Sequence, residues 1–262
     1  DYTICFDGLI YNSNEIKNEL IYRGIDAKNM NDARLVLHAY IKWGVGCLRR
    51  LNGIFAFAIW NSKTRELFLA RDRFGIKPLY YSKVCDSFYF ASELKALLKH
   101  PKINAELDKN GLCEVLGLGP AQSQGTGIFK DIYEINPGCC ATYNANGFYQ
   151  GRYWNLISKG YGGSFEECCD HVKKLTCNAI ESQLEDKGKE LCFFLSGGLD
   201  SSIITALAAK KFGPGINTFS LEYAGNEEYF EPNEYQPASD GYFINLMSET
   251  YRTNHHRVVI DN

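Results

Sequence analysis

A short apolar run, a glycine-rich turn and a helical pattern follow one another at residues 190–212, ELCFFLSGGLDSSIITALAAKKF. ELCFFL is short and wholly apolar, as expected for a strand that is covered on both faces. SSIITALAAKKF predicts a helix that stops at Gly213-Pro214-Gly215. Since INTFSLEY, GYFINLMSETY and HRVVI continue the alternation of strand and helix, we expect a parallel, doubly wound sheet in this half.

The turn SGGLDSS has the composition of a phosphate-binding loop. Gly197 and Gly198 allow the backbone to approach a ligand closely. The helix that follows directs its free amides and the positive end of its dipole at the loop. Ser196, Ser201 and Ser202 add hydroxyl donors. The pattern therefore predicts a site for phosphate oxygens, although it lacks the lysine of a GxxxxGK[ST] loop and is not GxGxxG.

Asp200 indicates what accompanies the phosphates. A carboxylate beside bound phosphates would repel them unless a cation bridges the two, so the loop implies Mg²⁺. Two glycines alone would equally fit a plain strand-to-helix connection. The complete S-G-G-x-D-S-S pattern after an apolar strand favours the phosphate site.

The first half reads as mixed α and β. Asn12 can cap a helix with Glu15 at its third position, and a second helix is predicted over 32–43. The runs GIFAFAIWN, RELFLARD and SFYFAS predict an antiparallel sheet. Further strands are expected in GIFKDIYEI and CATYNANGFYQGRYW, joined through the turn Asn136-Pro137-Gly138.

A glycine-rich linker over 159–164 separates the two halves. After it, Ser164 and Glu167 form a capping box for a helix. The apolar positions of that helix are expected to be buried, and they are Val172, Leu175, Ala179 and Ile180.

Composition narrows the class of protein. The net charge is −3 and no basic cluster stands out, which gives no reason to expect a nucleic-acid partner. No apolar run approaches the ~20 residues of a membrane span, and no secretory signal is visible, so we expect a cytoplasmic protein. Ten cysteines, with two vicinal pairs and no CxxC, are expected to be reduced and mostly buried, with disulfides or a metal as lesser alternatives.

SGGLDSS resembles the pyrophosphate-binding loop of ATP-pyrophosphatase enzymes. The segments FDGLIYN, LNGIFAFAIWN, LFLARDRFGIKPLYY and FASELKALL, in this order, resemble the glutamine-hydrolysing asparagine synthetases. This resemblance implies an α/β protein of two domains. Residues 1–155 would form an Ntn-type glutaminase, a sandwich of two sheets between helices, and residues 164–262 an ATP-pyrophosphatase domain.

The family's chemistry follows from the same resemblance. The glutaminase frees ammonia from glutamine, and the synthetase uses ATP to activate aspartate as β-aspartyl-AMP, which the ammonia converts to asparagine. The implied substrates are glutamine, aspartate and ATP, and a second copy of the chain is a candidate partner. The positions that match the ATP and pyrophosphate site are Leu195, Ser196, Gly197, Gly198, Asp200, Ser201, Ser202 and Leu221, with Asp200 also assigned to Mg²⁺.

The glutamine-binding positions depart from the family pattern. The family's NGE reads Asp7-Gly8-Leu9 here, and an ionised Asp7 would repel the oxyanion that the family's asparagine stabilises. Leu9 cannot pair with the substrate amine as the family's glutamate does. Asp32 matches the family aspartate that holds that amine, with a helix N-cap as the alternative. Asp7, Gly8 and Asp32 are therefore the expected glutamine-binding residues.

No catalytic residue is assigned. The family's N-terminal cysteine nucleophile and its glutamine-gripping arginine segment are not found in the sequence, and Cys5 does not stand in for the nucleophile. Both are expected before Asp1, and the later synthetase residues after Asn262. We therefore expect a fragment that makes no asparagine by itself.

Two alternatives stay open. One is a related amide-forming enzyme, such as a lactam synthetase or peptide cyclase, whose glutaminase domains are degenerate. The other is a non-catalytic protein that keeps nucleotide binding. Two charged clusters are not assigned to a site. Arg71, Asp72, Arg73 and Lys77 are interpreted as a structural turn, and the pair His255-His256 as surface groups or groups behind a site.

Overall fold

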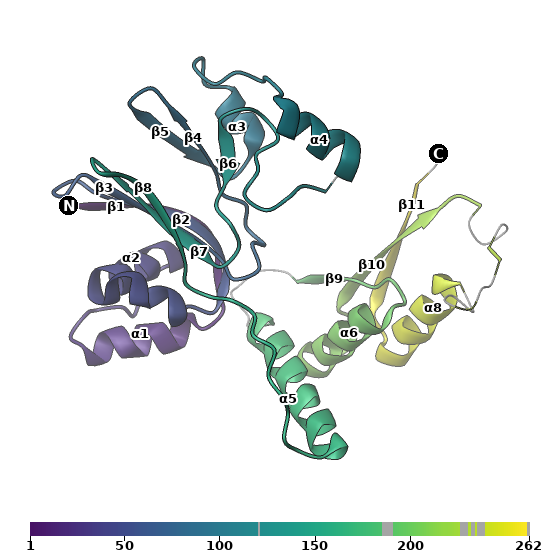
Figure 1. Cartoon of the computed structure of the whole chain (residues 1–262). Coiled ribbons are helices and arrows are strands. Elements are labelled where there is room, and N and C mark those ends of the chain that lie inside the picture. The colour runs from purple at the N-terminus through teal and green to yellow at the C-terminus, as the bar shows by residue number, and fades with distance from the viewer. Residues whose placement is uncertain (120, 185–190, 226–229, 232–233, 235–238, 261–262) are drawn as a thin grey trace. The chain divides into compact units, whose positions relative to one another are not determined.

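The computed structural model describes the whole chain except residues 120, 185–190, 226–229, 232–233, 235–238 and 261–262, and it divides into two compact units, Asp1–Lys159 and Gly160–Asn262 (Figure 1). The elements of the first unit are β1 (Tyr2–Ile10), α1 (Ser13–Tyr22), α2 (Asp32–Trp43), the 3-10 helix η1 (Gly44–Arg49), β2 (Gly53–Asn61), β3 (Glu66–Arg71), β4 (Tyr80–Val84), β5 (Ser87–Ala91), α3 (Leu94–Leu98), α4 (Lys109–Leu118), β6 (Ile132–Glu134), β7 (Cys139–Asn144) and β8 (Gly147–Arg152). Those of the second are α5 (Phe165–Gln183), β9 (Cys192–Phe194), α6 (Leu199–Phe212), β10 (Asn217–Tyr223), α8 (Asp240–Tyr251) and β11 (Asn254–Ile260).

The first unit contains two antiparallel sheets. Their strand orders are β1-β2-β3-β7-β8 and β5-β4-β6. The expectation that SFYFAS shares a sheet with GIFAFAIWN and RELFLARD is wrong, because it forms β5 and pairs with β4. The sequence analysis missed β4, which lies at the end of RDRFGIKPLYY, where the chain leaves the first sheet and enters the second.

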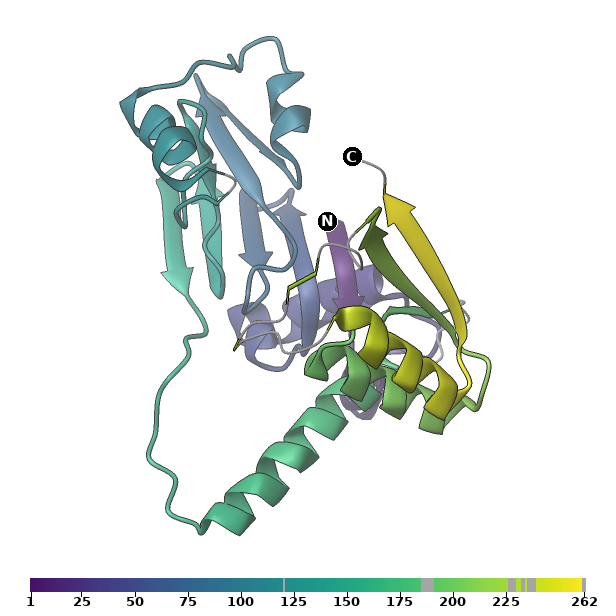
Figure 2. The ribbon, with the colours of Figure 1, turned by 90° about the vertical axis from the view of Figure 1, so that its right-hand side faces the viewer.

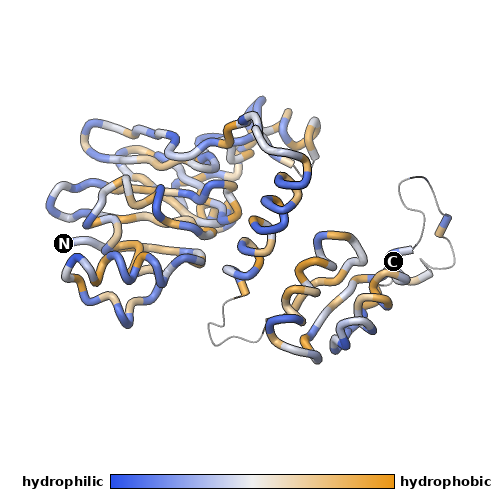
Figure 3. Tube along the Cα trace, turned by 90° about the horizontal axis from the view of Figure 1, so that it is seen from below, coloured by the Kyte–Doolittle hydropathy of each residue, from blue (hydrophilic) through white to orange (hydrophobic). Residues whose placement is uncertain are grey.

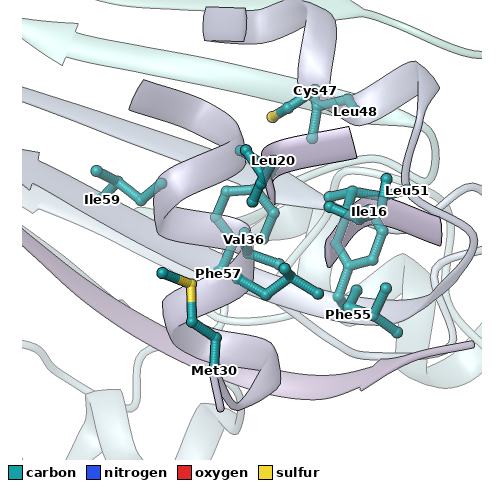
Figure 4. Packing of buried hydrophobic residues seen from close by; sticks show 14 of the residues in the cluster. Ile16, Leu20, Met30, Val36, Cys47, Leu48, Leu51, Phe55, Phe57 and Ile59 are labelled. Carbon is teal, nitrogen blue, oxygen red and sulfur yellow. The ribbon is translucent and has the colours of Figure 1, made fainter. Parts of the chain in front are cut away.

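Three apolar clusters hold these sheets in a four-layer sandwich. Helices α1 and α2 cover one face of the first sheet, and side chains such as Leu20, Val36 and Phe57 pack between them (Figure 4). A second cluster joins the two sheets, with Leu69 of β3 near Tyr81 of β4. A third packs α3 on the outer face of the second sheet. This arrangement confirms the expected sandwich of two sheets between helices.

The residues at the helix ends predicted the bounds of α2 correctly but not the cap of α1. Helix α2 has the predicted bounds, and Asn31 caps it by accepting a hydrogen bond from the Arg34 N–H at 3.0 Å. Asn12 does not cap α1 with its side chain, contrary to expectation. Its Oδ1 instead accepts from the Asn52 N–H at 2.9 Å, because the start of α1 lies against the turn before β2.

The second unit is built on a parallel sheet in the order β11-β10-β9, as predicted for an α/β domain. Helices α6 and α8 pack together on one side of it (Figure 2). The prediction that ELCFFL is covered on both faces is wrong for the described residues. β9 is the edge strand there, and Phe194 is 72% exposed, whereas the next residue, Leu195, is fully buried.

Helix α5 begins at the predicted capping box, which Ser164 and Glu167 complete. The expected buried face is wrong, because no residue of α5 is buried and both Val172 and Leu175 are 56% exposed. In Figure 3, the helix that leads into the grey trace is α5, and hydrophilic residues predominate along it.

All ten cysteines are free in the structure. The expectation that most are buried is wrong, since only Cys47 and Cys139 are. None of the helices that the structure describes is long and apolar enough to cross a membrane.

Cysteine alkylation at pH 8 should discriminate sharply between Cys5 and Cys47. Cys5 is exposed on β1, whereas burial, with a smaller contribution from Cys140, raises the pKa of the Cys47 thiol to about 12. Because the thiolate is the nucleophile, iodoacetamide should label Cys5 within minutes and Cys47 only after unfolding. Peptide mapping by mass spectrometry, with a urea-denatured control, checks this. Equal labelling rates in the folded chain would contradict it.

Candidate functional site

The SGGLDSS loop connects β9 to α6 in the conformation that its glycines allow. Gly197 has φ +79°, which favours glycine, and Gly198 is the N-cap residue of α6. The first helical bond runs from the Ser202 N–H to the Gly198 carbonyl at 3.1 Å. The amides of the preceding turn have no such carbonyl behind them, so they point out of the helix toward the loop.

One serine holds the loop together. The Ser201 hydroxyl donates to the Gly198 carbonyl at 3.1 Å and accepts from the Ser196 N–H at 3.2 Å. The two hydroxyls, of Ser196 and Ser201, lie 3.1 Å apart. All three serines of the loop were expected to donate to phosphate, but in this structure the Ser201 hydroxyl first shapes the turn.

A cavity of about 490 Å³ lies beside this loop, and we call it the loop pocket. It is formed by the ends of β9 and β10 together with the start of α8. Its lining residues are Phe194, Leu195, Ser196, Phe219, Ser220, Leu221, Glu222, Tyr223, Ser239, Asp240, Gly241 and Ile244.

Leu195 and Leu221 face the loop pocket from two strands that part there. The Leu195 N–H donates to the Phe219 carbonyl at 2.8 Å, and Phe219 is the last residue of β10 that is paired with β9. β10 continues to Tyr223. Backbone N–H and C=O groups alternate in direction along a strand, so those of Leu221 point to the same side as those of Phe219. On that side β9 has already ended, and among the described residues the backbone of Leu221 has no partner strand there. The carboxyl edge of a parallel sheet is a usual place for a nucleotide.

The sequence analysis missed the contribution of α8. A Cβ added to Gly197 would lie 2.7 Å from the carbonyl oxygen of Asp240, the first residue of that helix. The loop and the start of α8 are therefore in close contact. The signal was present in the sequence, since the strand–helix alternation places the N-terminus of this helix at the same sheet edge.

Asp200 lies in the first turn of α6, exposed to solvent. Among the described residues no group of three or more His, Cys, Asp or Glu side chains could hold a metal by itself. Mg²⁺ binds through one or two carboxylates, phosphate oxygens and water, so a single carboxylate would suffice if the loop held phosphates.

The glutamine-binding candidates lie on and beside β1 in the first unit. Gly8 has φ +148°, and a Cβ there would meet the Ile54 carbonyl oxygen at 2.1 Å, so β1 and β2 approach more closely than any other residue would permit. Asp32 Oδ2 accepts from the Ile10 N–H at 2.8 Å. Asn31 is the N-cap of α2, so the alternative that Asp32 caps the helix is wrong. Asp32 instead joins α2 to the strand that carries Asp7 and Gly8.

Lys77 contacts Asp7, which the sequence analysis did not foresee. Lys77 Nζ lies 3.0 Å from Asp7 Oδ1, and both side chains are partly exposed. The Lys77 backbone is fixed on both sides, because its N–H donates to Asp72 Oδ2 at 2.9 Å and its carbonyl accepts from Arg71 Nε at 2.8 Å. The ammonium therefore offsets the negative charge of Asp7.

Arg71 and Asp72 have the structural role that was predicted for this turn. Asp72 is 1% exposed and accepts from the N–H groups of Phe55, Phe74, Ile76 and Lys77. Arg71 is 5% exposed and pairs with Glu134 at 2.8 Å. The cluster holds the crossing between the two sheets.

Comparison with known proteins agrees with this architecture. The family model of the glutamine amidotransferase domain matches residues 1–154, and that of asparagine synthase matches residues 171–262. Asparagine synthetase (glutamine-hydrolyzing) 3 of Bacillus subtilis strain 168 is 44% identical over 263 residues, which cover 99% of this chain and 43% of that protein. Asparagine synthetase (glutamine-hydrolyzing) 1 of the same strain is 31% identical, with coverages of 85% and 35%.

Among solved structures, the glutamine phosphoribosylpyrophosphate amidotransferase from B. subtilis complexed with ADP and GMP aligns with a TM-score of 0.42 and 13% identity. The alignment covers 98% of this chain and 61% of that one. The chain spans less than half the length of the two B. subtilis asparagine synthetases. The two consecutive family matches, together with the 44% identity over 99% of the chain, show that the chain belongs to the family of glutamine-hydrolysing asparagine synthetases.

Proposed function

We propose that the chain is part of an asparagine synthetase that uses ATP to activate aspartate and ammonia from glutamine to aminate it. Residues 164–262 would form the ATP-binding part of the synthetase and residues 1–155 the glutaminase-like part. The observation that carries the proposal is the position of SGGLDSS, at a helix start beside a 490 Å³ cavity at the carboxyl edge of a parallel sheet.

Each residue near the loop pocket has a part in this proposal. The amides at the start of α6, with Ser196, Gly197, Gly198 and Ser202, would bind the β- and γ-phosphates, while Ser201 keeps the turn in shape. The adenosine would lie between Leu195 and Leu221, where the strands part. Mg²⁺ beside Asp200 would supply charge neutralisation for the pyrophosphate that leaves.

The first unit would bind glutamine at Asp7, Gly8 and Asp32. The ion pair with Lys77 supports a site in which Asp7 is neutralised rather than one in which it faces an oxyanion alone. The whole protein would be cytoplasmic, and a homodimer is its candidate assembly. The replacement of the family's asparagine and glutamate by Asp7 and Leu9 keeps a related amide-forming synthetase as the second candidate.

Titration of the chain with ATP, with and without Mg²⁺, tests the nucleotide site. Mg²⁺ should strengthen ATP binding about tenfold through Asp200, and Asp200→Asn should abolish that gain, because the carboxylate would bridge to the phosphates through the metal. Isothermal titration calorimetry measures both constants. Asp170→Asn, an exposed aspartate on α5, is the control that should behave as the original chain.

Two results would count against the proposal. One is an original chain that does not bind ATP. The other is an Asp200→Asn variant that keeps the full effect of Mg²⁺. To separate the two candidate functions, ATP–pyrophosphate exchange by the whole protein should require aspartate. Exchange that is independent of aspartate would favour the related amide-forming synthetase.

A further inference from the structure

A row of hydrogen-bonded polar side chains crosses the second unit and includes Ser220, which lines the loop pocket. The imidazole of His255, on β11, lies between two side chains of β10. Its Nδ1 is 3.0 Å from Thr218 Oγ1, and its Nε2 is 3.1 Å from Ser220 Oγ. Thr218 is fully buried and Ser220 is 2% exposed, so their hydroxyls depend on partners inside the protein.

The row of hydrogen bonds continues from Thr218, away from the loop pocket, to Ser248 of α8. Thr218 Oγ1 is 2.9 Å from Thr253 Oγ1, which is 3.0 Å from Ser248 Oγ. A line of hydroxyl groups therefore reaches His255 on its Nδ1 side, and both ring nitrogens are occupied. Such a chain is cooperative, because the direction in which one hydroxyl donates fixes the direction of the next.

The protonation state of the His255 ring limits the hydrogen bonds that Ser220 can form. Burial, and then the nearby Arg257, lower the pKa of His255, against a smaller opposing effect of Glu222. At neutral pH the ring is therefore neutral and has one donor nitrogen and one acceptor nitrogen. Ser220 then either accepts from Nε2–H and turns its own proton elsewhere, or donates to Nε2 and turns a lone pair elsewhere.

Ser220 is also one of the residues that line the loop pocket. Ser220 directly precedes Leu221, on the part of β10 that extends past the end of β9. The hydrogen bond with the ring decides where the single proton of the Ser220 hydroxyl lies: if Ser220 accepts from Nε2–H, that proton is available to a ligand, and if it donates to Nε2, only lone pairs remain. Neither Ser220 nor His255 was assigned to the site from the sequence.

We propose that His255 is a positioning residue that orients the Ser220 hydroxyl toward the nucleotide in the loop pocket. The proposal rests on the proposed function, since it takes the ligand of this pocket to be ATP. It adds a polar contact, made by Ser220, to the backbone groups of Leu195 and Leu221. His255 acts only through Ser220 and does not touch the nucleotide.

A double-mutant cycle on ATP binding tests this coupling. Ser220→Ala should weaken ATP binding about fivefold, the equivalent of one hydrogen bond. His255→Asn should cost the same, because its amide lies near the Nδ1 position and falls short of Ser220. His255→Gln places its amide near the Nε2 position and should retain affinity within about twofold. The variant with both Ser220→Ala and His255→Asn should be no weaker than Ser220→Ala alone.

The results of the ATP titrations separate a failure of this inference from a failure of the proposed function. Additive losses, or equal losses in the Gln and Asn variants, would show that His255 is merely structural and would overturn the inference. An original chain that binds Mg²⁺–ATP, with all His255 variants unchanged, would overturn the inference and leave the proposed function standing. An original chain that does not bind ATP would overturn both.

A spectroscopic readout covers the case in which a variant fails to fold. In the original chain labelled with ¹⁵N-histidine, the His255 ring should give one protonated and one unprotonated nitrogen signal at pH 7. Addition of Mg²⁺–ATP should shift the Nε2 signal, because the hydrogen bond to Ser220 changes when that hydroxyl engages a ligand. Saturation with ATP without any movement of that signal would overturn the inference.

Discussion

Replacement of Arg71 by methionine should destabilise the first unit by about 4 kcal/mol. The guanidinium is 7% exposed and pairs with Glu134, itself 9% exposed, at 2.8 Å. It also donates to the carbonyls of Gly75, Lys77 and Ile135, each at 2.8 Å. Methionine fills much of the same volume, but it leaves a buried carboxylate without its counter-charge and three carbonyls without a donor. Urea unfolding measures the change.

The chain contains a matched control on its surface. Arg50 pairs with Glu19 at 2.6 Å, but these side chains are 42% and 43% exposed. Arg50→Met should therefore cost less than about 1 kcal/mol, because solvent screens an exposed pair. In addition, Glu134→Leu in the Arg71→Met background should restore part of the loss, since it removes the orphaned charge. Equal losses for Arg71→Met and Arg50→Met would refute the view that this turn holds the two sheets together.

The elements that could be predicted were those with a strong local signal. The pattern of α2 gave its bounds, and the capping box of Ser164 and Glu167 marked the start of α5. The glycines and serines between β9 and α6 predicted a tight turn at a helix start, and Gly197 indeed has a positive φ directly before α6. In each case the information lies within a few residues of the chain, where backbone geometry and capping decide the structure.

What could not be predicted depends on partners far away in the chain. The ion pair of Asp7 with Lys77 joins residues 70 positions apart, and only the crossing between sheets brings them together. β4 was missed because its sequence continues a charged turn, and its pairing with β5 and β6 is what makes it a strand. The apolar pattern of α5 predicted burial, but periodicity cannot say which surface will cover a helix.

Gly197→Ala should destabilise the second unit by about 3 kcal/mol and displace the SGGLDSS loop from α8. The residue has φ +79°, where an L-residue is strained. An added Cβ would also lie 2.7 Å from the Asp240 carbonyl oxygen and 3.3 Å from Phe243 Cβ. The nearer neighbour is backbone, so relief requires the start of α8 to move. Chemical denaturation, monitored by a signal that comes from the second unit alone, measures the loss in its free energy of unfolding.

The adjacent glycine provides the comparison. Gly198 has φ −72°, and the nearest atom to an added Cβ is Ser196 Oγ, at 3.6 Å. Gly198→Ala should therefore change the free energy of unfolding by less than about 0.5 kcal/mol. If it nevertheless abolishes ATP binding, the phosphates approach the backbone at Gly198, where a methyl group would exclude them. If the two variants are equally stable, contact with α8 does not set the shape of the loop, and the glycine pair serves the ligand alone.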